Sequence, residues 1–156
     1  MVGDVVIGLA SSGVHSNGMT LARKVLPKNM WMNLLTPTKI YVKEVLNILN
    51  NYDIHGLAHI TGSGFRNLER ITRHGFYLDN LPEAHMIFRK IKENAGVSDE
   101  EMYKTFNMGV GFCVITDKKT AGRIIEKHGK EYDAAIIGSV VESGLKLKVN
   151  GDEISL

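Results

Sequence analysis

The sequence predicts a single-domain α+β fold, an α/β layer sandwich in which helices flank one mixed β-sheet. The first observation is size and composition, because 156 residues with 44% hydrophobic content match one globular domain of roughly 100–200 residues. The second is the alternation of short apolar strand patterns with helical patterns along the chain. The third is that residues 1–156 contain no internal repeat and no linker-like segment. We therefore expect one domain over residues 1–156.

Strand patterns recur along the whole chain. Residues 5–10 are apolar on both parities, which is typical of a strand buried on both faces. Residues 145–149 alternate apolar and basic side chains, and Asn150-Gly151 predicts a hairpin turn before Ile154. Further strands are expected at residues 55–60, 75–78, 109–115 and 132–141.

Helical patterns fill the intervals. A helix is expected at 19–26, stopped near Pro27, and another after Thr38 as its cap, with apolar residues at helical spacing up to Tyr52. Shorter helices are expected at 65–71 and after Ser98, which begins a capping box. Further helices are expected at 82–94, with Pro82 in its first turn, and after Asp117. Strands and helices thus alternate as a layered fold requires.

Charge and cysteine content exclude several protein classes. Lys and Arg number 19 against 17 Asp and Glu, so no nucleic-acid partner is expected, and the basic residues between 118 and 130 read as a solvated helix face. A lone Cys113 within an apolar strand predicts a buried, inert thiol and no internal disulfide. No apolar run approaches 18 residues and no signal peptide is visible, so we expect a cytoplasmic protein without membrane contact.

Three loops rich in glycine and small polar residues adjoin the predicted strands. They are Ser11-Ser12-Gly13-Val14-His15-Ser16-Asn17-Gly18, Thr61-Gly62-Ser63-Gly64 and Asn107-Met108-Gly109-Val110-Gly111. Backbone N–H groups in such loops bind anions, and a following helix adds its positive N-terminal end. The first two loops lie between a strand and a helix, so they are candidate phosphate-binding loops at one sheet edge. Neither matches a P-loop or a dinucleotide fingerprint, and ordinary turns are the alternative interpretation.

His15 is the best single candidate for chemistry, because an imidazole among Ser12, Ser16 and Asn17 is able to hydrogen-bond a ligand or move a proton. The alternative is a histidine that only orders the loop. His59 is expected to be a core histidine, and His128 a surface one. Four methionines are expected to pack in the core, namely Met19, Met30, Met32 and Met86. No spacing of side chains predicts a metal site.

Several blocks of the sequence resemble the C-terminal domain of the aminoimidazole ribonucleotide synthetases, or phosphoribosylformylglycinamidine cyclo-ligases. They occur in family order and span nearly the whole chain. The blocks are Gly3-Asp4-Val5-Val6-Ile7-Gly8-Leu9 with the following Ser11 to Gly18 loop, Pro37-Thr38-Lys39-Ile40-Tyr41-Val42-Lys43, His59-Ile60-Thr61-Gly62-Ser63-Gly64-Phe65, and Glu101 to Gly111.

The resemblance implies an activity and its partners. In such enzymes ATP phosphorylates the amide oxygen of formylglycinamidine ribonucleotide, and the amidine nitrogen then closes the imidazole ring with release of phosphate. The subunits have two domains and dimerise through the N-terminal one, which carries most of the groups that handle ATP and Mg²⁺. The C-terminal domain closes the cleft and helps to hold substrate and phosphate. This chain alone is therefore expected to bind neither ATP nor Mg²⁺ tightly and to be inactive.

The three loops supply the expected site residues. His15 is the expected catalytic residue, while Asn107 and Met108 are expected to shape the cleft wall without performing chemistry. The expected substrate- and phosphate-binding residues are Ser11, Ser12, Gly13, Ser16, Asn17, Gly18, Thr61, Gly62, Ser63, Gly64, Asn107, Met108 and Gly109. No metal ligands are expected.

One departure from the family and two alternatives bear on this assignment. Ser63 stands where the family's Thr-Gly-Gly-Gly loop has glycine, so a side chain is added where backbone approaches a ligand. One alternative is the equivalent domain of a related enzyme, such as formylglycinamidine synthase, selenophosphate synthetase, a hydrogenase maturation factor or thiamine-phosphate kinase. The other is a binding or scaffold module without catalysis.

Overall fold

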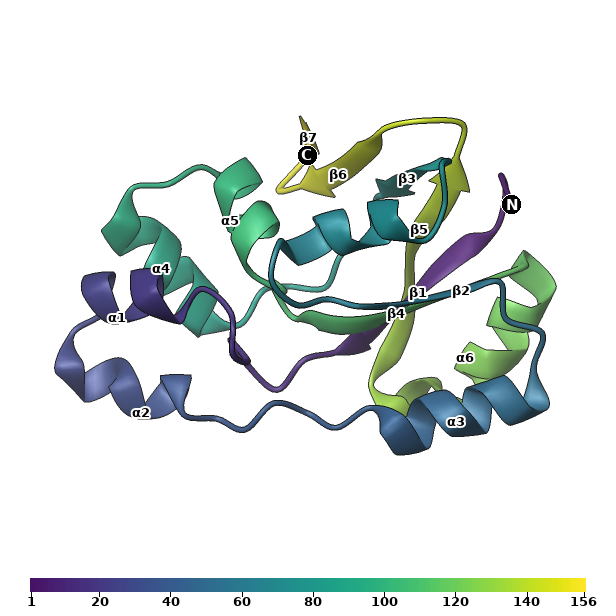
Figure 1. Cartoon of the computed structure of the whole chain (residues 1–156), viewed down its shortest axis with the longest axis horizontal. Coiled ribbons are helices and arrows are strands. Elements are labelled where there is room, and N and C mark those ends of the chain that lie inside the picture. Colours follow the sequence, from purple (N-terminus) through teal and green to yellow (C-terminus); the bar gives the residue numbers. More distant parts are fainter.

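A computed structural model describes all 156 residues and arranges seven strands in one sheet (Figure 1). The strands are β1 (Val5–Ala10), β2 (Gly56–His59), β3 (Gly75–Leu78), β4 (Val110–Thr116), β5 (Ala134–Val141), β6 (Leu145–Val149) and β7 (Asp152–Ser155). Their order across the sheet is β2-β4-β1-β5-β3-β6-β7. Only β3 and β6 pair in parallel, and all other neighbours are antiparallel. The predicted mixed sheet is confirmed.

Helices cover both faces of this sheet. They are α1 (Met19–Val25), α2 (Trp31–Leu34), α3 (Val42–Asn51), α4 (Met86–Ala95), α5 (Asp99–Thr105) and α6 (Lys118–Tyr132), with 3-10 helices η1 (Lys28–Met30) and η2 (Gly64–Arg70). Neighbouring β1 residues point to opposite faces, so Val6 belongs to a large apolar cluster and Ile7 to a smaller one. The large cluster packs α1, α4, α5 and η2, whereas α3 and α6 cover the other face.

The local capping and turn signals are confirmed. The Ser98 side chain accepts a hydrogen bond from the Glu101 N–H at the start of α5, and Asp117 accepts from the N–H groups of Lys119 and Thr120 at the start of α6. Asn150 and Gly151 both have positive φ, 53° and 95°, as a two-residue hairpin turn requires. Each of these features is determined by a few adjacent residues, so the sequence alone predicts it.

The predicted starts of two helices are wrong. Helix α3 begins at Val42 and not after Thr38, because residues 37–41 are held outside the helix by hydrogen bonds to the end of β1 and the loop after it. Helix α4 begins at Met86, so Pro82 lies before it and not in its first turn. Proline fixes φ near a value that extended segments also use. The short helix expected at 65–71 is the 3-10 helix η2.

Several burial predictions for single residues are also wrong. Met32 and Met86 are 73% and 65% exposed, because each lies on the outer side of a short helix; Met19 and Met30 pack against the large cluster as expected. His59 is exposed at the end of edge strand β2. His128 is buried and stacks on the Tyr132 ring, with 4.8 Å between the ring centroids.

Cys113 is fully buried in β4, as predicted. Burial raises the pKa of its thiol, which keeps the sulfur protonated and unreactive. None of the helices combines the length and the apolar character that a membrane-spanning segment needs.

Gly138 in β5 tests how tightly the sheet is packed, and Gly122 on the surface of α6 is its control. A Cβ at Gly138 in β5 would lie 2.2 Å from the Tyr77 carbonyl oxygen, whereas a Cβ at Gly122 on α6 would meet nothing within 4 Å. We predict that Gly138→Ala lowers the free energy of unfolding by at least about 2 kcal/mol through overpacking. Gly122→Ala should raise it by about 0.5–1 kcal/mol through helix propensity. Urea denaturation of both variants measures this, and equal effects would contradict the packing.

Candidate active site

The first and third glycine-rich loops are joined by buried hydrogen bonds at one edge of the sheet. The Ser11 hydroxyl donates to Asn107 Oδ1 at 2.8 Å, and Asn107 Nδ2 donates to the Gly13 carbonyl at 2.8 Å. The Ser11 N–H donates to the Gly109 carbonyl at 2.9 Å. Asn107 Oδ1 also accepts from the Gly109 N–H at 2.9 Å. The side-chain amide of Asn107 is therefore fully used in holding these two loops together.

The second loop lies against the first, and the Ile60 N–H just before it donates to the Gly111 carbonyl of the third loop at 2.9 Å. A Cβ placed on Gly62 would be 3.3 Å from Asn17 Oδ1, so this glycine adjoins the first loop. Gly64 has φ +53°, and a Cβ there would lie 2.0 Å from the Tyr103 carbonyl oxygen at the end of α5. Only glycine satisfies both the conformation and the close approach at this position. The structure thus brings all three predicted loops into one cluster.

A second asparagine holds the second loop. Asn67 in η2 is buried, and its Nδ2 donates to the carbonyls of Gly62 and Gly64 at 2.9 and 2.7 Å. The Gly64 N–H donates to the Thr61 carbonyl, and Ser63 has φ 77° and ψ 9°. This is a type II turn, in which the third residue needs positive φ and is usually glycine. Ser63 is this third residue, so the glycine that the family has here is explained by the positive φ that the turn requires.

Each of the three loops carries one non-glycine residue with left-handed backbone. They are His15 (φ 60°), Ser63 (φ 77°) and Met108 (φ 49°). Such conformations are unfavourable for these residue types and persist only where the surroundings enforce them. Their occurrence in all three loops, and the hydrogen bonds from Asn67 and Asn107, show that the cluster has one enforced geometry.

His15 lies buried in this cluster, with 5% of its surface exposed. The Ser12 N–H donates to His15 Nε2 at 3.3 Å, whereas Nδ1 is buried without a hydrogen-bond partner. Burial, and then the nearby His59 and His85 rings, lower the pKa of His15 below its ordinary value. The ring is therefore neutral at pH 7. Because Nε2 accepts, the proton resides on Nδ1, so the loop holds a buried, unpaired N–H donor.

Residues 37–41, named here the strap, fix the entry to the first loop. The Ser12 hydroxyl donates to the Pro37 carbonyl at 2.7 Å and accepts from the Lys39 N–H at 3.1 Å. The Tyr41 hydroxyl donates to the Ala10 carbonyl at 2.9 Å. Burial, followed by Glu44, raises the pKa of Tyr41, so this donor is retained at all moderate pH values.

The strap and Asn67 were missed as site residues by reasoning from the loops alone. The strap lies in the Pro37 to Lys43 block that carries the family resemblance, and this block was its only signal in the sequence. Asn67 had no such signal, since one asparagine in a helical segment is ordinary. The strap holds the first loop through Ser12, and Asn67 holds the second loop through two backbone carbonyls. A sequence pattern does not display such contacts.

The expected site residues divide into a buried frame and an accessible rim. The frame comprises Ser11, Gly13, His15, Gly64, Asn107, Met108 and Gly109; the rim comprises Ser12, Ser16, Asn17, Gly18, Thr61, Gly62 and Ser63. Rim residues come from the first two loops only. The side chains of the rim are therefore the ones accessible to a ligand, and the buried third loop packs beneath them.

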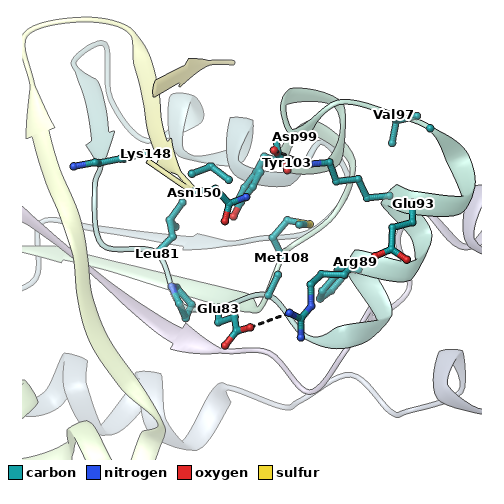
Figure 2. A pocket seen from close by; sticks show the side chains of 16 residues that line it. Leu81, Glu83, Arg89, Glu93, Val97, Asp99, Tyr103, Met108, Lys148 and Asn150 are labelled. Atoms are coloured by element: carbon teal, nitrogen blue, oxygen red, sulfur yellow. Dashed lines mark ion pairs between the residues drawn. The ribbon is translucent and has the colours of Figure 1, made fainter. Parts of the chain in front are cut away.

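A second hollow of the molecule does not coincide with the loop cluster. It has a volume of about 640 Å³ and shares only Met108 with the expected site (Figure 2). Four of its charged side chains form two ion pairs: Arg89 Nη1 lies 3.1 Å from Glu83 Oε1, and Lys92 Nζ lies 2.7 Å from Asp99 Oδ2. Because its lining has three basic and three acidic side chains, the cavity has little net attraction for an anion, and the loop cluster is the better candidate site.

The residues present do not fit a metal ion. Nowhere in the chain do three or more His, Cys, Asp or Glu side chains gather in a way that would hold one. Mg²⁺ needs oxygen ligands, usually carboxylates or substrate phosphates. The cluster supplies backbone N–H groups, hydroxyls and amides instead, which suits an anion.

Comparison with known proteins gives a consistent result. The family model described as "AIR synthase related protein, C-terminal domain" matches residues 1–150. Phosphoribosylformylglycinamidine cyclo-ligase of Methanocaldococcus jannaschii is 48% identical over 97% of this chain and 48% of its own length. The enzyme of the same name from Pyrococcus horikoshii is 45% identical over 98% of this chain and 48% of its own length. The chain therefore spans about half the length of the curated relatives it matches.

Solved structures share the fold at low sequence identity. A chain of a HypE–HypF complex superposes with a TM-score of 0.69 at 20% identity, covering all of this chain and 53% of that one. Thermotoga maritima PurL complexed with FGAR superposes with a TM-score of 0.62 at 15% identity, over 99% of this chain and 27% of that one. These likenesses show the fold.

Asn107 provides a test of the frame. Asn107→Asp keeps the acceptor for Ser11 and Gly109 but places a carboxylate oxygen against the Gly13 carbonyl. We predict a loss of about 2–3 kcal/mol in unfolding free energy at pH 8, since a buried acceptor loses its donor. Protonation of the new carboxyl restores a donor, so the difference from the parent chain should shrink as pH falls. Denaturation at several pH values measures this, with exposed Asn29→Asp as control; equal effects of the two substitutions would refute the role of Asn107.

Proposed function

Because the chain belongs to the family of AIR synthase related proteins, as their C-terminal domain, we propose that it is the C-terminal half of a phosphoribosylformylglycinamidine cyclo-ligase. The reaction would be the ATP-dependent ring closure of formylglycinamidine ribonucleotide to aminoimidazole ribonucleotide. One observation carries the proposal: three loops converge around the buried N–H of His15 in a chain 48% identical to an enzyme of that name. Relatives at 20% identity or below give no comparable reason to choose hydrogenase maturation or another activity.

The rim is proposed to bind the substrate's phosphate or the phosphate formed in the reaction. Asn67 draws the Gly62 carbonyl inward, and a trans peptide directs the following N–H, that of Ser63, the opposite way. Ser63 is exposed, so this N–H is available to an anion. The hydroxyls of Ser16, Thr61 and Ser63 add further donors around it. No positively charged side chain is needed for such a site.

His15 is proposed to donate a hydrogen bond from its Nδ1–H to the reacting group, once substrate binding opens the rim that covers this buried atom. The neutral ring has its Nε2 occupied by the Ser12 N–H, so only Nδ1 is left for a ligand. A donor preorganised in a buried position stabilises developing negative charge more effectively than one in water. The proton stays on Nδ1, and the hydrogen bond strengthens at the step where a substrate or phosphate oxygen gains negative charge.

Handling of ATP and Mg²⁺ is proposed to lie with the N-terminal half. The residues of this chain offer no set of carboxylates for the ion. The complete enzyme would be a cytoplasmic homodimer, with this chain closing the cleft over the other half.

The first test concerns the activity itself. We predict that the chain alone forms no aminoimidazole ribonucleotide above background, whereas fusion behind the N-terminal half of the M. jannaschii relative restores ATP-dependent product formation. The reason is that positioned phosphate and metal contacts are needed together with substrate orientation. A steady-state assay at high protein concentration measures both. Turnover by the chain alone, or a folded fusion that turns over no substrate, would contradict the proposed function.

The second test concerns His15. We predict that His15→Asn in that fusion lowers turnover on the order of 10²-fold, with little change in melting temperature. The shorter Asn side chain loses the contact with the Ser12 N–H that directs the donor, and Asn does not titrate. The parent's acid limb should lie below pH 6.5, since a lowered pKa keeps the ring neutral to lower pH. That limb should disappear in the variant. Near-normal turnover in a folded His15→Asn enzyme would reduce His15 to a loop-ordering residue.

A further inference from the structure

Helix α3 is apolar on its outer side as well as its inner one. Its inner side contributes Ile48 to the smaller core cluster. On the outer side Val42, Leu46 and Leu49 are 61%, 52% and 43% exposed, and their spacing of four and three residues places them on one stripe. Ile40 just before the helix is 78% exposed. An amphipathic surface helix normally presents polar residues to water, so this stripe is unusual for an outer surface.

The stripe is one wall of a shallow groove. The groove has a volume of about 380 Å³ and is lined by Ile40, Val42, Val45, Leu46, His59 and Phe112, among others. The His59 and Phe112 rings stack with 5.8 Å between centroids. We name this surface, from the outer side of α3 to His59 and Phe112, the α3 face. Contiguous exposed apolar surface of this kind marks an interaction site.

The α3 face is continuous with the candidate active site. The Tyr41 ring lies 5.8 Å from His59 and 5.6 Å from Phe112, and on its other side 6.3 Å from His15. The same Tyr41 bonds the end of β1. The strand that carries His59, β2, is the outermost strand of the sheet. A body seated on the α3 face would therefore stand beside the rim of the site, at the edge of the sheet.

We propose that the α3 face is the surface on which the enzyme's N-terminal half docks, an inference that rests on the proposed function. The curated relatives are about twice as long as this chain, and the matched family is their C-terminal domain, so a body of similar size accompanies it. That body has to supply the metal-handling groups absent here and hence has to reach the rim. The α3 face is the apolar surface adjoining the rim, and its partner presents a matching apolar surface.

Other exposed apolar side chains do not form a comparable surface. Met32 and Leu35 belong to the short α2 region and Met86 to the start of α4, and none of them lines the groove. Exposed polar side chains flank the stripe on α3 itself, at Lys43 and Asn50. A polar border around an apolar centre is the usual composition of a protein–protein interface. These flanking positions also provide matched controls.

The test uses the N-terminal half of the M. jannaschii relative, produced separately, as the probe. Its dissociation constant with this chain is measured by sedimentation and calorimetry. Leu46→Glu and Leu46→Lys should each weaken binding at least about tenfold, because either charge is desolvated in an apolar contact. Asn50→Glu, on the same helix, should stay within about twofold. Circular dichroism confirms that each variant is folded, and hydrogen exchange should show new protection over residues 40–49 in the parent complex.

Several results would overturn the proposal. They are no binding by the parent chain, unchanged binding by folded Leu46→Glu, or protection that leaves residues 40–49 unaffected. Self-association of the parent chain that Leu46→Glu abolishes would assign the α3 face to a second copy instead. A fusion that docks through this face yet makes no aminoimidazole ribonucleotide would refute the proposed function alone, so the two failures are distinguishable.

Discussion

The side-chain amide of Asn107 is the interaction on which the candidate site depends. Its oxygen accepts from Ser11 and from the Gly109 N–H, and its nitrogen donates to the Gly13 carbonyl. The segments after β1 and before β4 are nearly a hundred residues apart in sequence, and this one buried group sets their spacing. Unpaired polar groups would be left on both loops if the amide were absent. The position of His15, two residues beyond Gly13, follows from this arrangement.

A second level of structure is built on that frame. Asn67 fixes the carbonyls of the 61–64 turn in the way that Asn107 fixes those of the first loop, and the strap anchors Ser12 from outside. The first two loops are therefore held by these side chains mainly through their carbonyls, which leaves the Ser63 N–H free to face outward. Left-handed residues in every loop are the conformational consequence. Such a cluster has its anion donors in place before any ligand arrives, which reduces the reorganisation that binding requires.

The sequence predicts the parts of this design that depend on neighbouring residues. The apolar strand β1, the Ser98 and Asp117 caps and the Asn150-Gly151 hairpin are all correct because their signals are local. The predicted start of α3 is wrong because Ser12 and Ala10, far away in sequence, bond the strap and keep it out of the helix. His59 was assigned to the core because an apolar strand surrounds it, whereas its strand lies at the sheet edge. Strand order, and the partners of Asn67, are tertiary properties that no local pattern displays.

The chemistry of the site explains why this domain needs a companion. Its accessible groups are N–H donors and hydroxyls, and its one titratable group is a histidine kept neutral by burial. Donors of this kind orient and stabilise an anion, but they neither bind Mg²⁺ nor supply a strong base. Phosphoryl transfer from ATP needs the metal as well. The same residue that supports the site, Tyr41, also lies beneath the exposed apolar groove at its border. The proposed docking of a second domain on the α3 face accounts for both the chemical incompleteness of the site and the apolar surface beside it, since that domain would bring the missing groups to the rim.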